Sequence, residues 1–472
     1  MAHDYDLCIV GGGSAGLTVA AGAAQLGARV VLIERGEMGG DCLNYGCVPS
    51  KALIAAGHAA QAMRDAGRFG IAPVEPSVDF AATMDRVRSV IAAIAPNDSV
   101  ERFEKLGVRV LRTSARFVSP DTVEAGGERI RAHRCVIASG SRPAAPPIPG
   151  LDSVPYLTNE TVFANRQRPQ HLVIIGGGPI GMELAQAHHR LGSKVTVVEA
   201  GKALSKDDPE LTALVLDRLR EEGIEIREGA AARRVSASEG RIRVEVEGAT
   251  GPATVEGSHL LIAAGRKPNV SDLGLEAAGI AFDAKGIKVG PSLVTSNPVV
   301  YAIGDVIGGL QFTHVANYHA GIVIRRALFR MPAKVDPGII PWVTFTDPEL
   351  AHVGLTEAEA ASKHGKVNVL RWPYHENDRA QAEHATAGHV KVVTDKKGRI
   401  LGASIVGEHA GELIQMWALA LSQKMNIRAM TGFVSPYPTL TEINKRAAYK
   451  FFAGAPGSPI LRKVIGFLAK LG

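Results

Sequence analysis

The hydrophobic pattern near the N-terminus predicts a strand–helix–strand unit. Residues 6–10 form a short apolar run, and the glycine-rich turn 11–16 follows it at once. A helical pattern then covers 17–26, and a second apolar run at 29–33 ends at Glu34. Short apolar runs bounded by turn residues are typical of buried parallel strands, so this stretch predicts two such strands joined by a helix.

The same order of elements returns in the middle of the chain. An apolar run at 171–175, a glycine-rich turn at 176–181 and a helical pattern at 182–191 precede an apolar run at 194–198. Glu199 ends this unit, and it follows the first glycine of its turn at the same spacing as in the first copy (199 − 176 = 34 − 11 = 23). An internal repeat of this kind predicts two dinucleotide-binding sites.

Each turn has glycines where a dinucleotide fold needs them. The first glycine allows the tight turn, the second lets a pyrophosphate approach the backbone, and the third lets the helix touch the strand. The helix N-terminus faces the phosphates, and the acidic residue binds ribose hydroxyls. The predicted cofactor-binding residues are Gly11, Gly13, Ser14, Ala15, Gly16 and Glu34 in the first copy, and Gly176, Gly178, Ile180, Gly181 and Glu199 in the second.

The acidic residue of the second copy also bears on the choice of nucleotide. A carboxylate at Glu199 accepts hydrogen bonds from the adenosine 2′-hydroxyl and repels a 2′-phosphate. No arginine follows it directly, because the next residues are Ala200, Gly201 and Lys202. The sequence therefore favours NADH over NADPH.

Composition bounds the class of protein. A chain of 472 residues is too long for one hydrophobic core, so we expect two to four domains. The formal net charge is +6, but Lys and Arg are scattered, which does not favour nucleic-acid binding. Four cysteines are too few for a secreted disulfide scaffold. With an acidic start unlike a signal peptide and no long apolar run, the sequence predicts a cytoplasmic protein.

Two of the four cysteines stand close together in the stretch 39–51. Cys42 and Cys47 lie five positions apart, just before an alanine-rich helical pattern. They could be unrelated core thiols or metal ligands, but a metal site needs further ligands and the nearest histidine, His58, falls in the following helix, so we expect no metal site. The positive end of that helix would lower a thiol pKa, which favours a redox-active pair. Cys8 and Cys135 fall in strand patterns, and we expect buried thiols there.

The stretch 39–51 resembles the redox-active signature of the class I flavoprotein disulfide reductases, and similar motifs continue along nearly the whole chain. This family of pyridine nucleotide-disulfide oxidoreductases includes dihydrolipoamide dehydrogenase, glutathione reductase and mercuric reductase. The resemblance implies FAD in the first site and the pyridine nucleotide in the second. It also implies that Cys42 attacks substrate, that Cys47 lies against the flavin as a charge-transfer thiolate, and that Lys51 sits beside the flavin and pairs with Glu183.

Further segments resemble other parts of this family. Residues 138–143 are similar to the segment that closes the first flavin-binding half, 263–269 to the segment that leads out of the nucleotide domain, and 300–305 to the second flavin signature. The resemblance adds to the expected cofactor-binding residues Gly40, Lys51, Ser139, Gly140, Gly265, Gly304 and Asp305.

The resemblance implies an α/β fold with two Rossmann-like domains, for FAD and NAD, and an α+β C-terminal dimerisation domain. The Pro-rich hinge 143–150 is a natural boundary. Between the motifs, the pattern predicts helices from 52 to 107 with a break at 71–76, and a small β-meander from 108 to 136. The expected domains are 1–147 and 269–337 for FAD, 148–268 for NAD(P) and 338–472 for the interface.

The C-terminal third departs from the family at one position. The resemblance implies a homodimer in which a segment near the C-terminus reaches into the partner's active site. Many members have a His–Glu pair there, but this chain has Tyr437 with Glu442. A phenol titrates near 10 and an imidazole near 6.5, so Tyr437 would be a poor base, although it can donate a hydrogen bond or, ionised, bind a metal.

Mercuric reductases carry a tyrosine at this place and a second active-site tyrosine, which Tyr156 is similar to. They also use an extra cysteine pair near the C-terminus, whereas this chain has no cysteine after Cys135. We expect an FAD-dependent NAD(P)H oxidoreductase that passes electrons to the Cys42–Cys47 disulfide and on to a small-molecule or protein disulfide, or another acceptor. A mercuric reductase-like metal reductase, a dihydrolipoyl dehydrogenase and a slow redox sensor are the alternatives.

Two amphipathic helices are predicted in the last part of the chain. The first covers 412–423. In the tail 458–472, one helical face carries Ile460, Leu461, Val464, Ile465, Phe467, Leu468 and Leu471, with Arg462, Lys463 and Lys470 off that face. We expect this tail helix to pack on its own subunit, and contact with a membrane surface is the alternative.

Overall fold

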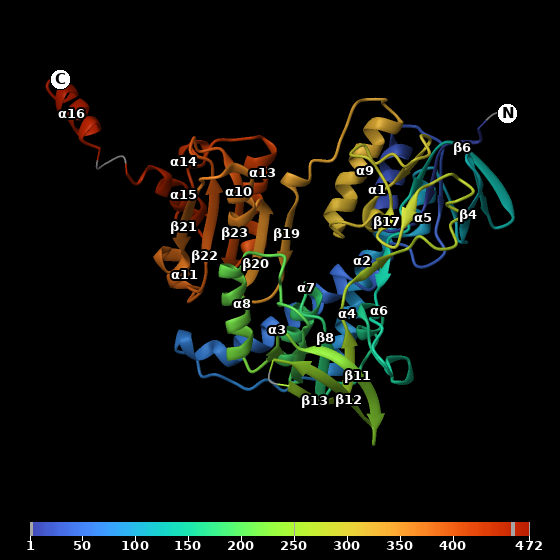
Figure 1. Cartoon of the computed structure of the whole chain (residues 1–472), viewed down its shortest axis with the longest axis horizontal. Helices are drawn as coiled ribbons and strands as arrows, with labels where there is room; N and C mark the ends of the chain where they lie inside the picture. The colour runs from blue at the N-terminus through green and yellow to red at the C-terminus, as the bar shows by residue number, and fades with distance from the viewer. Residues whose placement is uncertain (1–2, 250, 455–457, 472) are drawn as a thin grey trace. The chain divides into compact units, whose positions relative to one another are not determined.

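The computed structural model describes residues 3–249, 251–454 and 458–471. Internal contacts divide the chain into two units, labelled in Figure 1 by their elements. Unit 1 contains residues 1–202 and 224–336, and unit 2 contains Ala203–Gly223 together with the chain from Pro337 onward. Segment 203–223 falls inside the range 148–268 that the sequence predicts for the NAD(P) domain. By its contacts in the structure, however, this segment belongs to unit 2. The domain ranges themselves stay a prediction.

Unit 1 contains a parallel sheet that corresponds to the first predicted unit. Its parallel strands, in spatial order, are β3 (Val108–Leu111), β2 (Val30–Ile33), β1 (Tyr5–Val10), β6 (Glu128–Ile137) and β18 (Val300–Ala302). Both strands predicted for the first copy are confirmed. The prediction of one meander over 108–136 is wrong for its first strand, because β3 pairs in parallel with β2. Only β4 (Ala115–Ser119), β5 (Thr122–Ala125) and β6 are joined antiparallel.

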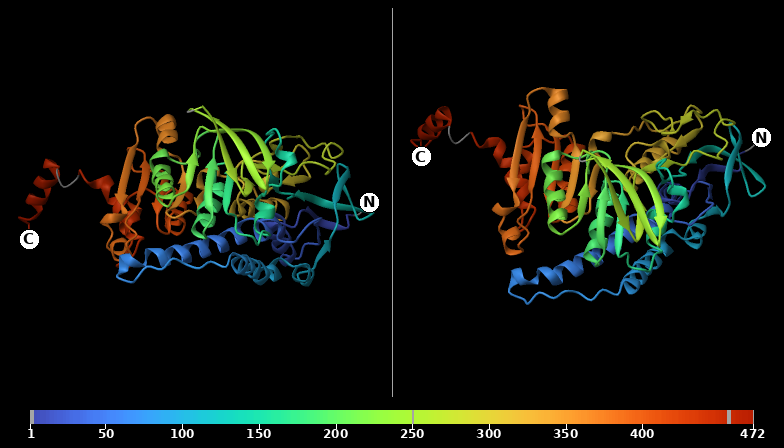
Figure 2. Two further views of the ribbon diagram at one scale, coloured as in Figure 1. Left: turned by 90° about the horizontal axis from the view of Figure 1, so that it is seen from below. Right: turned by 60° about the horizontal axis from the view of Figure 1, so that its bottom comes forward.

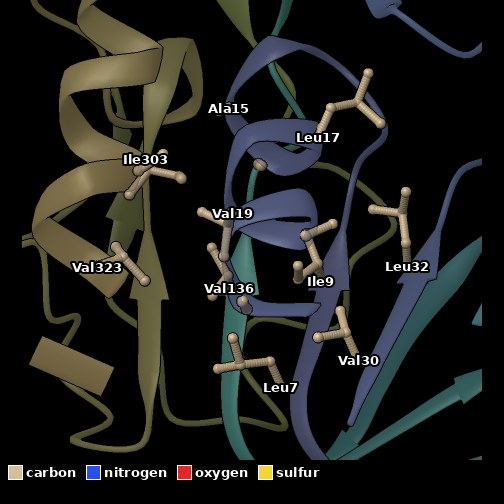
Figure 3. Close-up of a cluster of buried hydrophobic side chains, with 14 of the residues drawn as sticks. Leu7, Ile9, Ala15, Leu17, Val19, Val30, Leu32, Val136, Ile303 and Val323 are labelled. Atoms are coloured by element: carbon tan, nitrogen blue, oxygen red, sulfur yellow. The ribbon is translucent and has the colours of Figure 1, made fainter. Parts of the chain in front are cut away.

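The core of this sheet lies against two helices, α1 (Ser14–Gln25) and α9 (Thr313–Ala327). Figure 3 shows side chains from distant parts of the chain gathered there, among them Leu7, Val19 and Val323. Each fully buried aliphatic side chain contributes about 1.5–3 kcal/mol to folding. Helix α1 begins three residues earlier than the pattern predicts, because the extended backbone of Gly13 forms its N-cap.

The second predicted unit forms a separate parallel sheet in unit 1. Its strands, in spatial order, are β10 (Glu225–Arg227), β9 (Lys194–Val198), β8 (His171–Ile175) and β14 (His259–Ile262). Strands β8 and β9 have the predicted bounds, and the predicted helix is α7 (Pro179–Arg190). Figure 2 shows the neighbouring antiparallel sheet in yellow-green. This sheet shares a core with β8 and consists of β11 (Ala231–Ser238), β12 (Arg241–Gly248) and β13 (Gly251–Gly257).

Helical segments between β2 and β3 confirm the predicted helical pattern after residue 52. The longest are α3 (Cys47–Arg64) and α4 (Phe80–Ile94), which pack together, and α3 also packs on α7. Helix α3 begins at Cys47 itself, earlier than the alanine-rich run suggests. The shorter elements of unit 1 are α2 (Gly40–Asn44), α5 (Val100–Lys105), α6 (Asn159–Val162), β7 (Ser141–Pro143), β15 (Arg266–Pro268), β16 (Phe282–Asp283) and β17 (Gly286–Ile287).

Unit 2 is built on a five-stranded antiparallel sheet. Its strands, in spatial order, are β19 (Pro341–Thr344), β20 (Glu349–Gly354), β23 (Ile400–Gly407), β22 (His389–Thr394) and β21 (Asn368–Pro373). Its helices are α8 (Pro209–Glu221), α10 (Glu357–His364), α11 (Asp378–Ala382), α12 (Ala410–Leu413), α13 (Gln415–Ser422), α14 (Ala429–Gly432), α15 (Glu442–Tyr449) and α16 (Pro459–Leu468). The helix predicted over 412–423 is confirmed from Gln415 to Ser422 as α13, whereas its first residues belong to the separate helix α12, which ends at Leu413.

A buried charge cluster holds α8 to this sheet. The Lys391 side chain is only 4% exposed, and its Nζ lies 2.7 Å from carboxylate oxygens of Asp208, Glu210 and Glu357. A buried ammonium is stable only when it is paired and hydrogen-bonded in this way. The cluster explains why residues 203–223 belong with unit 2 by contact.

The structure tests whether a helix could span a membrane and whether the tail helix packs on the rest of the chain. Within the described residues, the structure contains no helix that is long and apolar enough to cross a bilayer. The expectation that the tail helix packs on its own subunit is wrong, because every residue of α16 is exposed. The sheets and helices of the two units confirm the predicted α/β fold.

Candidate active site

The two cysteines lie on consecutive helices of unit 1. Cys42 is inside the short helix α2, and Cys47 is the first residue of α3. Left-handed backbone at Gly39 (φ 85°) and Gly40 (φ 59°) starts this loop. A Cβ at Gly40 would stand 2.8 Å from the Cα of Gly13, so glycine is required for the redox loop to contact the first nucleotide turn.

The two thiols of the pair have pKa values shifted in opposite directions. Both sulfurs are free thiols, with Cys47 the more exposed. The hydrogen bond from Cys42 lowers the pKa of Cys47 to about 6, and contacts from Thr313 and the charge of Lys51 add to this against the effect of burial. The same hydrogen bond, and then burial, raise the pKa of Cys42 well above its usual range. Cys47, at a helix N-terminus, is therefore the more acidic thiol of the pair.

An ion pair beside the thiols connects the two nucleotide-binding parts of unit 1. The Nζ atom of Lys51 on α3 lies 2.6 Å from Oε2 of Glu183 on α7. The Glu183 side chain is buried and that of Lys51 is about one-third exposed. The structure thus brings together the Lys–Glu pair that the sequence predicts from resemblance, and it positions a cation near Cys47.

A second polar network holds the residue that precedes Cys42. Asp41 accepts a hydrogen bond from Asn159, and its Oδ1 lies 3.1 Å from the guanidinium of Arg266. Arg266 also donates to the Ser141 hydroxyl over 2.7 Å, and that hydroxyl donates to Asp305 over 2.6 Å. The redox loop and the second flavin signature are therefore parts of one hydrogen-bonded network.

The first glycine turn fits a dinucleotide. A Cβ on Gly11 would stand 2.2 Å from the carbonyl oxygen of Ala138, and one on Gly16 would stand 1.9 Å from that of Gly11, so both glycines are needed for packing. By contrast, a Cβ on Gly140 would meet open space. Helix α1 begins at Ser14 and Ala15 with first-turn N–H groups that have no intrahelical partner, which suits a pyrophosphate.

Other predicted flavin residues lie around this turn. Glu34, at the end of β2, accepts hydrogen bonds from the backbone N–H groups of Gly12 and Gly36. Ser139 donates to the carbonyl of Asn269. Burial raises the pKa of Asp305, against its hydrogen bond from Ser141. The turn follows β1, Glu34 follows β2 and Asp305 follows β18. These strands are parallel, so the groups lie at the carboxyl edge of one sheet, and the residues present fit FAD.

The second glycine turn has the same construction. A Cβ on Gly176 would stand 2.3 Å from a backbone carbonyl oxygen, and one on Gly181 would stand 2.0 Å from another. Gly178 and Gly265 face open space, and Ile180, in the first turn of α7, is exposed. Both carboxylate oxygens of Glu199 accept hydrogen bonds of 2.7 Å, from the N–H groups of Gly177 and Gly201. These residues fit a pyridine nucleotide.

Tyr437 and Glu442 belong to unit 2 rather than to the unit that holds the thiols. Tyr437 is 71% exposed, and its hydroxyl donates a 2.9 Å hydrogen bond to Asp378. That bond, together with the charges of Asp378 and Glu442, raises the pKa of Tyr437. Glu442 is the first residue of α15. Tyr156, the other tyrosine singled out in the sequence, is partly buried in unit 1 against the core beside β8.

Besides the Asn159 and Ser141 contacts described above, the structure adds four polar residues in unit 1 and one beside Tyr437 in unit 2. They are Asp41, Arg266 and Thr313 near the thiols, His319, whose Nδ1 accepts from the Gly304 N–H over 3.3 Å, and Asp378 beside Tyr437. Burial lowers the pKa of His319 to about 4, which keeps it a neutral acceptor. Arg266 lies in a segment that the sequence already marks. Asp41 lies in the stretch 39–51, which the sequence also marks, whereas Thr313, His319 and Asp378 have no local pattern that could have found them.

Comparison of the chain with models of known protein families matches it to the pyridine nucleotide-disulphide oxidoreductases. The model of the pyridine nucleotide-disulphide oxidoreductases matches residues 5–320, and that of their dimerisation domain matches 340–448. A mercuric reductase of Bacillus cereus is 37% identical over 95% of this chain and 72% of its own length. A dihydrolipoyl dehydrogenase of Geobacillus stearothermophilus is 35% identical over 95% of this chain and 96% of its own length.

Solved structures of related proteins show the same fold. The Cu(II) complex of the HOCl-induced flavoprotein disulfide reductase RclA from Escherichia coli aligns with a TM-score of 0.83 and 29% identity, over 93% of this chain and 98% of its own. LpdA from Mycobacterium tuberculosis aligns with a TM-score of 0.87 and 26% identity, over 95% of this chain and 99% of its own.

Proposed function

Because this chain belongs to the pyridine nucleotide-disulfide oxidoreductases, which use FAD and NAD(P)H, we propose that it takes electrons from NADH and delivers them through Cys42–Cys47 to a thiophilic metal ion. One observation carries the choice of acceptor. Tyr437, at the position of the family's histidine, donates a hydrogen bond to Asp378 and has a raised pKa. It therefore cannot serve as a base near neutral pH.

The fixed carboxylate of Glu199 supports NADH as the donor. Its two oxygens are held by the N–H groups of Gly177 and Gly201 at the end of β9. A carboxylate held there accepts hydrogen bonds from ribose hydroxyls, and it stands against the negative charge of a 2′-phosphate. Glu34 has the same arrangement in the first copy, where FAD carries no 2′-phosphate.

The chain's own residues divide the work at the thiols. Bound FAD supplies electron transfer between the nicotinamide and the disulfide. Lys51, held by Glu183, keeps a positive charge near the Cys47 thiolate. Asp41, held by Arg266, fixes the start of α2, so that Cys42 is presented next to Cys47. Cys42 holds the remaining proton of the reduced pair.

A metal ion suits a site without a histidine acid. A soft divalent ion binds thiolate and displaces the Cys42 proton into water, so no base has to hold that proton. Oxidation of the reduced Cys42–Cys47 pair to its disulfide releases two electrons, which reduce one Hg²⁺ to Hg⁰ or two Cu²⁺ to two Cu⁺; NADH then reduces the disulfide again. Reduction of a disulfide instead releases a thiolate that must be protonated, which is the task of the family's histidine.

Relatives and neighbours support both acceptor classes. Mercuric reductases are 37% and 36% identical to this chain, and the RclA structure holds Cu(II). A disulfide or dihydrolipoamide is the second candidate, favoured by the 35% identity to a dihydrolipoyl dehydrogenase. A slow redox sensor would show negligible turnover with every acceptor. The dimerisation domain supports a homodimer, and in this proposal the partner's Tyr437 segment completes the site.

Anaerobic titration of the FAD-loaded protein with NADH tests the relay. Thiolate next to oxidised flavin is expected to give a long-wavelength charge-transfer band. Cys47→Ser is expected to abolish this band, whereas Cys42→Ser retains it because Cys47 is still present. Absence of the band in the unmodified protein would overturn the proposed role of the pair.

Steady-state assays with Hg²⁺, Cu²⁺, lipoamide and glutathione disulfide test the acceptor, with NADH and NADPH in parallel. We expect turnover with metal ions to exceed turnover with disulfides. Tyr437→His is expected to raise disulfide turnover, because it supplies an acid and base near neutral pH, whereas Tyr437→Phe does not. Faster lipoamide than metal turnover in the unmodified protein would reject the metal proposal and leave the relay intact.

A further inference from the structure

Helix α16 is encoded as a helix by its own sequence. Ser458 caps its N-terminus by accepting a hydrogen bond from the Leu461 N–H, and Pro459 occupies the first turn, where its fixed φ suits a helix. Apolar residues recur at spacings of three and four, so they share one side of the helix. They are Ile460, Leu461, Val464, Ile465, Phe467, Leu468 and Leu471.

This apolar face is exposed along its whole length. Ile460 is 75% exposed, Phe467 is 63% exposed, and the other members of the face are exposed as well. Figure 1 labels α16 at the C-terminal end of the chain. A contiguous apolar face in contact with water is costly, and such faces mark interaction sites. The proposed redox reaction makes no use of it.

The charge around α16 indicates what covers it. Residues 443–472 contain six basic side chains and no acidic one: Lys445, Arg446, Lys450, Arg462, Lys463 and Lys470. The last three belong to the tail 458–472 and lie away from its apolar face. An occupant must therefore be apolar where it meets the helix and negatively charged at its surface. A second copy of this helix would bring like charges together, which disfavours self-association through the tail.

We propose that α16 lies in the interface of an anionic lipid bilayer, with its apolar face among the acyl chains and its basic residues at the headgroups. Ten residues give a helix of about 15 Å, which is half the hydrocarbon thickness and suits a helix lying flat rather than spanning. A single short helix binds reversibly, and a homodimer presents two, which strengthens attachment.

Vesicle co-sedimentation of the full-length, FAD-loaded protein tests this. We expect binding to vesicles of phosphatidylcholine mixed with phosphatidylglycerol, and much weaker binding to phosphatidylcholine alone. Phe467→Glu removes a large side chain from the apolar face and is expected to weaken binding at least about tenfold. The double variant Arg462→Glu, Lys463→Glu is expected to weaken vesicle binding by about fivefold or more per charge. This difference is expected to shrink at high salt, which screens the charges.

A matched control separates the tail from general surface change. Leu26→Glu introduces the same charge at another exposed apolar position, 55% exposed in unit 1, and is expected to leave vesicle binding unchanged. The rate of NADH oxidation without vesicles is expected to be equal in all variants. Failure of the membrane proposal can therefore be told apart from failure of the proposed electron acceptor.

Three results would overturn the proposal. They are no binding to the anionic vesicles, equal binding to neutral vesicles, or a change of oligomeric state in Phe467→Glu by light scattering. The last result would assign the apolar face to a second copy of the chain.

Discussion

The two glycine-rich turns of unit 1 are near copies in backbone and in packing. Gly11 and Gly176 have φ values of 116° and 117°. A Cβ on Gly16 or on Gly181 would stand 1.9 or 2.0 Å from a carbonyl oxygen of its own turn. In both copies an acidic residue at the end of the next strand accepts two backbone hydrogen bonds.

The two copies differ in the segment that comes after the acidic residue. After Glu34 the chain enters the redox loop, and Gly40 contacts the second glycine of the first turn. After Glu199 the chain continues into segment 203–223, which belongs to unit 2, and a Cβ on Gly178 would meet open space. The glycine-rich turn is thus sufficient to form a nucleotide-binding site. The redox chemistry depends in addition on the loop that packs against the first turn.

The largest expected effect is on cofactor retention. Gly16→Ala places a methyl group 1.9 Å from the carbonyl oxygen of Gly11, so the backbone must move, at a cost of about 1–3 kcal/mol or more. We expect this variant to lose FAD, as measured by the ratio of flavin absorbance to protein. Gly181→Ala has the equivalent clash and is expected to retain FAD but not to be reduced by NADH. Loss of the same cofactor in both variants would contradict the assignment of the two sites.

The next effect concerns the two acidic residues. Glu199→Ala removes a charged hydrogen-bond acceptor, worth about 1.5–3 kcal/mol, so KM for NADH is expected to rise by about 10- to 100-fold. KM for NADPH is expected to fall, because the repulsion of the 2′-phosphate is lost. Glu34→Ala serves as the control and is expected to lower FAD content without changing the preference between nucleotides. An unchanged NADH to NADPH ratio in Glu199→Ala would reject its role in specificity.

A smaller effect concerns the Lys51–Glu183 ion pair, which joins the helix after the cysteine pair to the helix of the second copy. The Cys47 thiolate forms above its lowered pKa, so the charge-transfer band is expected to be lost as the pH falls through about 6. Lys51→Met removes a cation that favours the thiolate, and the midpoint is expected to rise by about one pH unit. Glu183→Gln keeps the Lys51 charge and is expected to shift the midpoint less. Spectrophotometric pH titration of the two-electron-reduced protein measures both, and a downward shift in Lys51→Met would contradict this account.

The smallest effect is on stability at the second glycine of the second copy. Gly178→Ala places a methyl group where the structure has no atom within 4 Å, so the free energy of unfolding is expected to change by less than about 1 kcal/mol. The KM for NADH is nevertheless expected to rise, because the methyl group stands where a pyrophosphate approaches. Thermal unfolding, compared with that of Gly181→Ala, separates the two roles of glycine in one turn.

The sequence predicts the structure correctly where a short-range pattern decides it. Strands β8 and β9, both glycine turns and the helices after them were predicted from periodicity and spacing, because an apolar run next to a glycine turn has few alternatives. The sequence also predicts that the cysteine pair lies next to a helix start, because a helical pattern follows it directly, and α3 begins at Cys47. The prediction over 108–136 was wrong for β3, since a strand pattern does not reveal which neighbour it pairs with.

By itself, the sequence determined the two nucleotide cradles, the cysteine pair and the amphipathic tail, all of which are local arrangements of a few neighbouring residues. Only the tertiary structure decided which distant groups meet. It joins Asp41 to Arg266, Cys47 to Thr313, and Tyr437 to Asp378, and it moves segment 203–223 into unit 2. Such contacts depend on how whole elements pack, because hydrogen bonds between residues far apart in the chain leave no period or spacing in the sequence.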